Sequence, residues 1–314
     1  MPRTTHTCSM VYVAVCLLVV CLLATADKGM AAPTCVPLPA DVIAWWSGNT
    51  DAEDMSSNHE NAVLQSGAQA GVPGFVAGAF YFDGVTGVAN TPVLLPQQGT
   101  VELWVKPSSL STTHGLLGTF GTANGNDRLW MVATGPGGGP GVGPNRLVVN
   151  LGSCCVNDID IPSPLLVGTW THMALTFDYQ ANQHTLYVNG QAVITSMAAR
   201  NTPTRPVSFG AITSDFGQAF FFPGLLDEVS LYERVLSASE IRALFTAGSA
   251  GKCVPFGGSV TGAMLTKVVC QNKTTRRSTT IQLPSGATTW DCTAAGLVVH
   301  TGDKLSVTIE GTGD

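Results

Sequence analysis

A polar loop near the start of the chain is the richest source of metal ligands in the sequence. Residues 49–61 separate two apolar segments and are dense in carboxylate, amide and hydroxyl side chains. Calcium prefers six to eight oxygen ligands that mix carboxylates, amides and backbone carbonyls. The candidate ligands are Asn49, Asp51, Asp54, Ser56 and Asn58. The loop lacks the spacing of an EF-hand, and the alternative is a solvated turn without metal.

Tryptophans and histidines are the other residues that could contact a ligand. Aromatic faces stack on sugar rings, but aromatic side chains also fill the cores of β-sandwiches. Trp104 is on the strand face opposite Val101, Leu103 and Val105, where it could line the concave sheet, although packing in the core or between strands is the favoured interpretation. Trp104 and Trp130 are the candidate ligand-binding residues. His172 and His184 are expected on partly exposed strand faces rather than on a metal.

Composition restricts the class of protein. Only 11% of the 314 residues are charged and the net charge is -6, so the chain has no basic footprint for nucleic acid. It contains 35 glycines and 18 prolines, and long helical patterns are scarce. Many short strands joined by tight turns are expected, which is typical of an all-β sandwich or barrel.

The N-terminus carries an export signal. Arg3 and His6 precede an apolar run, and small residues follow at 24–26. We expect a signal peptide over residues 1–26, with cleavage as late as residue 32 as the alternative. The run is short for a membrane span, and no later segment is long and apolar enough to insert. The mature protein is therefore predicted to be secreted, extracellular or at the cell surface.

Strand and helix signals become clear further along the chain. Residues 100–106 and 170–178 alternate between apolar and polar side chains, as strands do. Asn189 and Gly190 supply the two residues of a type I′ hairpin turn. In residues 224–248 a strand is followed by a capped helix, with Ser237 and Glu240 at the spacing of a capping box. Alternation predicts one strand face formed by Leu225, Asp227, Val229 and Leu231.

These motifs occur in a recognisable order. Two tryptophans, a polar loop and a Phe-Asp-Gly turn are followed by Trp-Thr-His, Leu-Tyr-Val-Asn-Gly and the closing strand and helix. This order resembles laminin-G-like jelly-roll domains of the concanavalin A-like sandwich group over residues 35–253. The resemblance implies an all-β, two-sheet antiparallel jelly roll, and it implies binding rather than catalysis.

The resemblance also gives a role to Asp227. Laminin-G-like jelly rolls often hold one calcium ion with a carboxylate of the closing strand, and Asp227 is at that position. The predicted structural calcium ligands are thus Asn49, Asp51, Asp54, Asn58 and Asp227. The alternative is that Asp227 caps backbone amides. An unpaired carboxylate on the apolar face with Val229 would be costly.

The carboxylates do not match a sandwich glycosidase. Such enzymes place two carboxylates on one strand so that both flank the bond being cut. Adjacent residues of a strand point to opposite faces, so Asp227 and Glu228 are expected to face apart. The chain also has no Gly-x-Ser-x-Gly elbow and no His-Glu-x-x-His helix. We therefore expect no enzymatic activity.

Six of the nine cysteines remain after signal removal. Six cysteines in an exported chain allow fifteen disulfide pairings. Cys35 and Cys253 bracket the expected jelly roll, whose first and last strands lie side by side, so we predict that they pair. Cys270 and Cys292 are predicted to pair within one short segment. Cys154 and Cys155 are left as a vicinal bridge, an interchain bridge or free thiols.

The C-terminal segment, after Cys253, does not continue the jelly-roll motifs. Residues 254–258 are expected to be a linker, and residues 259–314 a small β unit that the end of the chain could truncate. The predicted function is a secreted, non-catalytic module that binds a glycan or a surface protein. The alternatives are a structural or adhesive spacer of a larger surface assembly and a sandwich-type polysaccharide hydrolase or lyase.

Overall fold

The computed structural model describes most of the chain from residue 35 onward. The described residues are 35–121, 127–139, 142–151, 158–199, 202–214, 217–254, 257–259, 263–274, 276–284, 287–293, 295, 297, 299 and 304–313. The predicted signal peptide, Cys154 and Cys155 lie outside these residues. Among the helices in the described part, none has the length and apolar character needed to cross a membrane.

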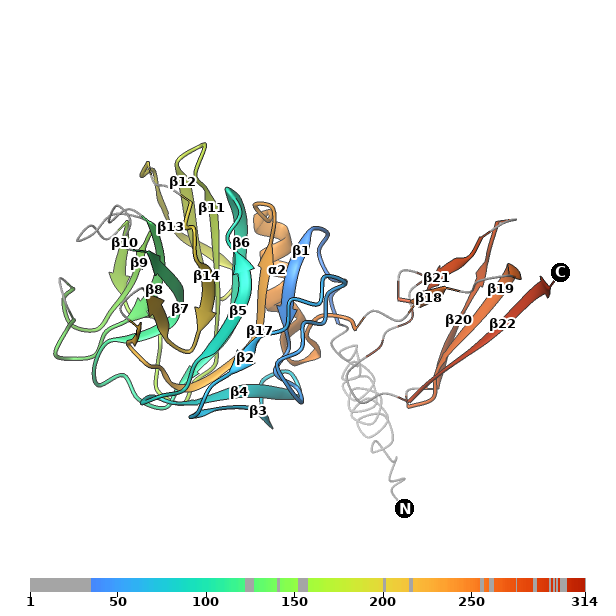
Figure 1. Ribbon diagram of the computed structural model, residues 1–314, viewed down its shortest axis with the longest axis horizontal. Coiled ribbons are helices and arrows are strands. Elements are labelled where there is room, and N and C mark those ends of the chain that lie inside the picture. Colours follow the sequence, from blue (N-terminus) through green and yellow to red (C-terminus); the bar gives the residue numbers. More distant parts are fainter. Residues whose placement is uncertain are drawn as a thin grey trace, which may run out of the picture. The chain divides into compact units, whose positions relative to one another are not determined.

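Two antiparallel sheets form a sandwich, which confirms the predicted fold class (Figure 1). The first sheet has the order β13 (Gln191–Ser196), β12 (Gln183–Val188), β11 (Thr171–Asp178), β6 (Gln98–Pro107), β17 (Pro223–Tyr232), β4 (Gly78–Asp83) and β3 (Ala68–Pro73), and β1 (Val42–Trp46) also pairs with β17. The second has the order β10 (Ile159–Pro162), β9 (Arg146–Asn150), β8 (Asp127–Ala133), β7 (His114–Gly121), β14 (Pro206–Phe209), β5 (Ala89–Leu94) and β2 (Val63–Leu64). The hairpin of β15 (Ile212–Ser214) and β16 (Gly217–Ala219) joins it at β7.

The main core lies between the two sheets. Val101, Leu103 and Val105 of β6 are buried there, as their alternation predicts. Alternate residues of β11, from Met173 to Phe177, face the same core. The hairpin between β12 and β13 turns at Asn189 and Gly190, whose φ angles of 48° and 71° are those a type I′ turn requires.

A β-bulge in β17 overturns two sequence-based predictions. The register with β6 shifts between Asp227 and Ser230, and Glu228 has a φ of 56°. The extra residue interrupts the alternation. Asp227 pairs with Trp104 and lies on the outer face of the sheet, whereas Val229 points into the core. The expectations that Asp227 shares the face of Val229 and that Asp227 and Glu228 face apart are therefore wrong.

The helix α2 (Ala238–Ala247) covers part of this outer face (Figure 1). The predicted capping box is present: Ser237 Oγ accepts from the Glu240 amide, and the Glu240 carboxylate accepts from the Ser237 amide. Ile241 and Leu244 pack with Tyr187 and Tyr232 of the sheet. A short 3-10 helix, η1 (Gly248–Ala250), leads from α2 to Lys252 and Cys253.

The structure contains the disulfide that was predicted to close the sandwich. Cys35 and Cys253 are joined, with their Cα atoms 4.9 Å apart and 218 residues between them in sequence. Beside it, the Val36 amide donates to Gly251 O and the Cys253 amide donates to Val36 O. The two ends of the jelly roll are thus fastened covalently and by main-chain hydrogen bonds.

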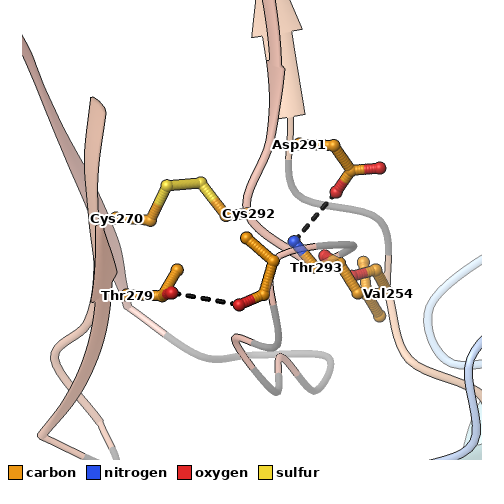
Figure 2. The surroundings of a disulfide bond; sticks show 7 residues. Val254, Cys270, Thr279, Asp291, Cys292 and Thr293 are labelled. Atoms are coloured by element: carbon orange, nitrogen blue, oxygen red, sulfur yellow. Dashed lines mark hydrogen bonds between the residues drawn. A yellow bond between two sulfur atoms is a disulfide. The ribbon is translucent and has the colours of Figure 1, made fainter. Parts of the chain in front are cut away.

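The C-terminal segment builds two small sheets of its own. One pairs β18 (Gly257–Ser259) with β21 (Thr289–Asp291), and the other has the order β20 (Arg277–Gln282), β19 (Ala263–Asn272) and β22 (Leu305–Gly313). The predicted linker 254–258 overlaps β18, and its role as a domain boundary stays a prediction. Cys270 and Cys292 form the second predicted disulfide, next to Asp291 and Thr293 in Figure 2. This disulfide belongs to a separate apolar cluster with Leu265, Val268 and Leu297.

Candidate functional site

A cluster of charged side chains is buried on the outer face of the first sheet. Lys252 Nζ lies 3.0 Å from Glu102 Oε2 and 3.0 Å from Glu228 Oε2, and it donates to Glu228 O at 3.2 Å. His172 Nε2 lies 3.1 Å from Glu102 Oε1. His172 and His184 are both fully buried, so the expectation that they lie on partly exposed strand faces is wrong. Glu102 comes from β6, Glu228 from the bulge of β17, and Lys252 from the segment before the closing disulfide. The bulge brings the two glutamates onto one face.

Each charge in this cluster alters its neighbours. Burial alone would raise the pKa of Glu102, but attraction to Lys252 outweighs it and holds that pKa below the usual range. Burial raises the pKa of Glu228, and the nearby charge of Glu102 adds to the rise that Lys252 opposes. The two carboxylates hold the pKa of Lys252 above its usual range against the effect of burial. The ammonium therefore neutralises a pair that could not otherwise stay buried.

Solvent does not reach these carboxylates. The exposed fraction is 1% for Glu102, 1% for Glu228 and 4% for Lys252. The ring of Trp45 lies 5.5 Å from Lys252 Nζ and adds to the cover. Glu102 and Glu228 form a carboxylate pair on one face, which the sequence analysis did not predict. In a glycosidase, however, both carboxylates must reach the sugar. The ion pairs of Lys252 with Glu102 and Glu228 hold the C-terminal end of the sandwich against the sheet.

Three of the predicted calcium ligands, Asp51, Asp54 and Asn58, bond within the 49–61 loop or to the adjoining strand β1. Asp54 accepts from the amides of Trp45, Ser56 and Glu60 at 2.8–2.9 Å and from the Ser56 hydroxyl at 2.6 Å. Asp51 accepts from the Glu53 amide, and the Asn58 side-chain amide donates to Val42 O and Ile43 O of the first strand. These hydrogen bonds hold the 49–61 loop against the first strand.

The structure does bring Asn49 and Asp227 to one segment, residues 74–78. Asn49 Oδ1 accepts from the Gly78 amide at 2.7 Å, and Asp227 Oδ2 accepts from the amides of Phe75 and Val76 at 2.8 and 2.9 Å. Asp227 Oδ1 is buried without a hydrogen-bond partner. Burial, and then the charge of Glu228, raise the pKa of Asp227 well above its usual range. Both the amide cap and the free oxygen are therefore present. Across the described ranges, His, Cys, Asp and Glu side chains form no group of three suited to a metal ion.

The two candidate tryptophans differ in access. Trp104 is 5% exposed and is enclosed by Phe75, His172 and Phe245, with ring centroids 4.0–5.9 Å away. It fills a packed aromatic cluster and offers no face to a ligand. Trp130 is half-buried on the outer face of the second sheet, against Phe220 and below Arg128. No contact described for Trp130 decides whether it meets a ligand, and its role stays a prediction.

Among the residues that the structure describes, two sets line open cavities on the sandwich. The larger, of about 660 Å³, is lined by Asp41, Pro96, Gln97, Gln98, Asp178, Gln180, Glu233 and Arg234. The smaller, of about 440 Å³, is lined by Leu64, Gln65, Ser66, Thr86, Gln218 and Phe221. Both volumes fall in the range of small-molecule sites. Amide side chains occur in both, and the smaller cavity adds an aromatic ring.

Comparison with known proteins places the fold in a family. A family model described as the concanavalin A-like lectin/glucanases superfamily matches residues 82–242. The chain belongs to this superfamily. The match spans the sandwich from the end of β4 into α2, and so it includes the charged strands β6 and β17. No curated protein matches the chain in sequence.

Solved structures similar to this concanavalin A-like sandwich include carbohydrate-binding domains. Domain 4 of an extracellular arabinanase of family GH43 from Geobacillus stearothermophilus, in complex with arabinotriose, has 23% identity and a TM-score of 0.45, and the match covers 64% of this chain and 97% of that one. A CBM40 of the Ruminococcus gnavus IT-sialidase bound to α2,3-sialyllactose has 22% identity and a TM-score of 0.40, covering 48% and 83%. Trypanosoma rangeli sialidase in complex with sialic acid has 19% identity and a TM-score of 0.48, covering 76% and 39%.

Two features of this superfamily member were not predicted from the sequence: the buried ion pairs of Lys252 and the smaller cavity. Lys252 has no pattern around it that would announce an ion pair. Glu102 did carry a signal, because a glutamate in the middle of an apolar core strand requires a buried partner. The smaller cavity combines Gln65, Gln218 and Phe221 from segments far apart in sequence, and no local motif connects them.

Proposed function

We propose that the mature protein is a secreted, non-catalytic module that binds glycans. The observation that carries this proposal is the contrast between the sealed carboxylates and the open cavities. Glu102 and Glu228 are closed off by Lys252, whereas the cavities present amide and hydroxyl side chains to solvent. Sugars need hydrogen-bond donors and acceptors together with an apolar or aromatic wall, and ligand sites commonly combine these.

A glycan array tests the proposal directly. The mature chain, labelled on a surface lysine, should bind a subset of immobilised oligosaccharides and release no reducing sugar from them. The Glu228→Gln variant serves as the control, because a binding module should keep its glycan profile while a hydrolase should lose turnover. Absence of binding across a broad array would reject glycan recognition, and turnover abolished by Glu228→Gln would reject the non-catalytic assignment.

Calcium is proposed as a structural ligand of the same domain. The free and buried Oδ1 of Asp227 supports it, since a cation would satisfy that oxygen and neutralise its charge. Asn49 lies at the same 74–78 segment and is the second ligand that the geometry favours. A bound cation would supply positive charge that orders this segment. It is given no part in contacting the sugar.

A spacer function is the second candidate, and one observation favours it. The Cys35–Cys253 bond joins the two ends of the sandwich. A force applied along the chain would pass through this bond and leave the sheets unloaded, which suits an adhesive stalk. Single-molecule stretching should then show no extension from the oxidised sandwich and a long extension after reduction.

A further inference from the structure

The smaller cavity is distinguished by the chemistry of its wall. Of the described residues that line it, none carries a formal charge: two are amides, two are hydroxyls, and Leu64 and Phe221 are apolar. By contrast, the larger cavity presents three carboxylates and Arg234 and has no aromatic ring. A neutral wall with one aromatic ring is suited to an uncharged, hydroxylated ligand.

The polar side of the cavity is fixed by its backbone. The Gln65 amide donates to Val88 O, and Gln65 O accepts from the Ala68 amide, both at 2.9 Å. On the neighbouring turn, Asp83 accepts from the Thr86 hydroxyl at 3.0 Å. Burial alone would raise the pKa of Asp83, but hydrogen bonds from three backbone amides and this hydroxyl lower it to about 2. The Asp83 carboxylate is thus committed to holding the turn of Thr86.

The aromatic wall is held in the same way. Phe220 has a φ of 58°, a left-handed conformation that is unusual for a bulky side chain. The hydrogen bonds around it oppose relaxation: Phe220 O accepts from the Gly115 amide at 2.5 Å, and the Phe222 amide donates to Gly210 O at 2.8 Å. Because Phe222 is buried in the core, Phe221 is left to line the cavity. Strained backbone of this kind tends to occur at binding sites.

The two amides retain groups for a ligand. Gln218 Nε2 donates to Gln65 Oε1 at 2.9 Å, which orients both side chains. This bond uses one donor and one acceptor of the pair, so Gln218 Oε1 and Gln65 Nε2 keep hydrogen-bonding capacity. A sugar hydroxyl both donates and accepts, and so it can bond to such a pair.

We infer that this cavity binds a neutral sugar residue of a glycan, stacked on Phe221 and hydrogen-bonded to Gln65 and Gln218. The inference rests on the proposed glycan-binding function and adds the ligand class. A sugar that carries a carboxylate is disfavoured, because the carboxylate would lose its hydration on binding and the residues that line the cavity include no cation to compensate. Selection for neutral over acidic sugars is therefore a property of the wall.

The test uses the mature chain and a panel of immobilised glycans. The panel pairs glycans ending in a neutral hexose or pentose with matched glycans whose terminal residue bears a carboxylate. The variants are Gln218→Ala and Phe221→Leu. The control is Gln180→Ala, since Gln180 donates to Gln97 at 2.6 Å in the larger cavity and so forms a matched amide pair. Melting temperatures confirm that each variant folds, and Gln218→Ala decides the result if Phe221→Leu is unstable.

The expected result is binding to neutral glycans that weakens at least about tenfold in both cavity variants, a change of about 1.4 kcal/mol, while Gln180→Ala stays within about twofold of wild type. Wild-type binding that both cavity variants retain would overturn the assignment to this cavity and leave the glycan-binding function standing. Preference for the acidic glycans would overturn the ligand class. A wild-type protein that binds no glycan at all would refute the proposed function, and this inference with it.

Discussion

Removing the ammonium of Lys252 should be among the most damaging single substitutions in the sandwich. Glu102 and Glu228 are each 1% exposed, and each contacts the Lys252 ammonium at 3.0 Å. Lys252→Met removes this cation and leaves both carboxylates buried without a positive partner. Breaking a buried ion pair from one side costs about 3–5 kcal/mol. For a domain of this size each kcal/mol lowers the melting temperature by about 2–4 °C. The expected loss is therefore about 6–20 °C.

Thermal unfolding followed by circular dichroism measures this loss, on protein shown by non-reducing mass mapping to keep the adjacent Cys253 bond. The matched control is Arg146→Met, because Arg146 contacts Asp160 at 2.6 Å with about a third of each side chain exposed. Exposed pairs contribute about 0–1 kcal/mol. Adding Glu102→Gln and Glu228→Gln to Lys252→Met should recover part of the stability, since the unpaired charges are removed. The reasoning is refuted if Lys252→Met and Arg146→Met melt alike.

Three further predictions concern the loop, the helix cap and the disulfide. Calcium at a hundredfold excess over its dissociation constant should stabilise the wild type by about 2.7 kcal/mol. Calorimetry with calcium and with chelator measures this difference. Asp227→Ala should abolish it. Glu240→Gln should destabilise the protein near neutral pH, where hydrogen bonding to Arg234 lowers the pKa of Glu240 to about 2. Because a depressed carboxyl pKa stabilises only the ionised form, the difference from wild type should shrink between pH 4.5 and 2 in pH-dependent melting. Reduction of the Cys35–Cys253 bond should lower stability by up to about 5 kcal/mol in denaturant titrations, given the long loop that it closes; an unchanged midpoint would contradict this.

The elements of the sandwich were predictable because their signals are local. Alternation in β6 and β11, the Asn189–Gly190 turn and the capping box of Ser237 and Glu240 each follow from a few adjacent residues. The Cys35–Cys253 pairing required more, namely the position of both cysteines at the ends of a recognised fold. Its Cα separation of 4.9 Å agrees with that reasoning.

The site was less predictable because it depends on one departure from regular geometry. Strict alternation places Asp227 with Val229, but the bulge at Glu228 turns Asp227 and Glu228 to the same outer face. A bulge at a non-glycine residue has no composition signal of its own. Because regular alternation was assumed for β17, no carboxylate pair was expected on one face, whereas the structure contains Glu102 and Glu228 there.

The burial of that pair supports the proposed non-catalytic function, for a reason that the sequence could not supply. A glycosidase requires one carboxyl to exchange protons with substrate and the other to approach the sugar. Here the ammonium of Lys252 lies between Glu102 and Glu228: it donates two hydrogen bonds to Glu228 and forms an ion pair with Glu102. Releasing the pair to a substrate would mean withdrawing Lys252 together with the disulfide-bonded Cys253 beside it. The bulge that brings the carboxylates together thus helps to hold the end of the chain on the sheet, and under the proposed function ligand recognition falls to the open cavities.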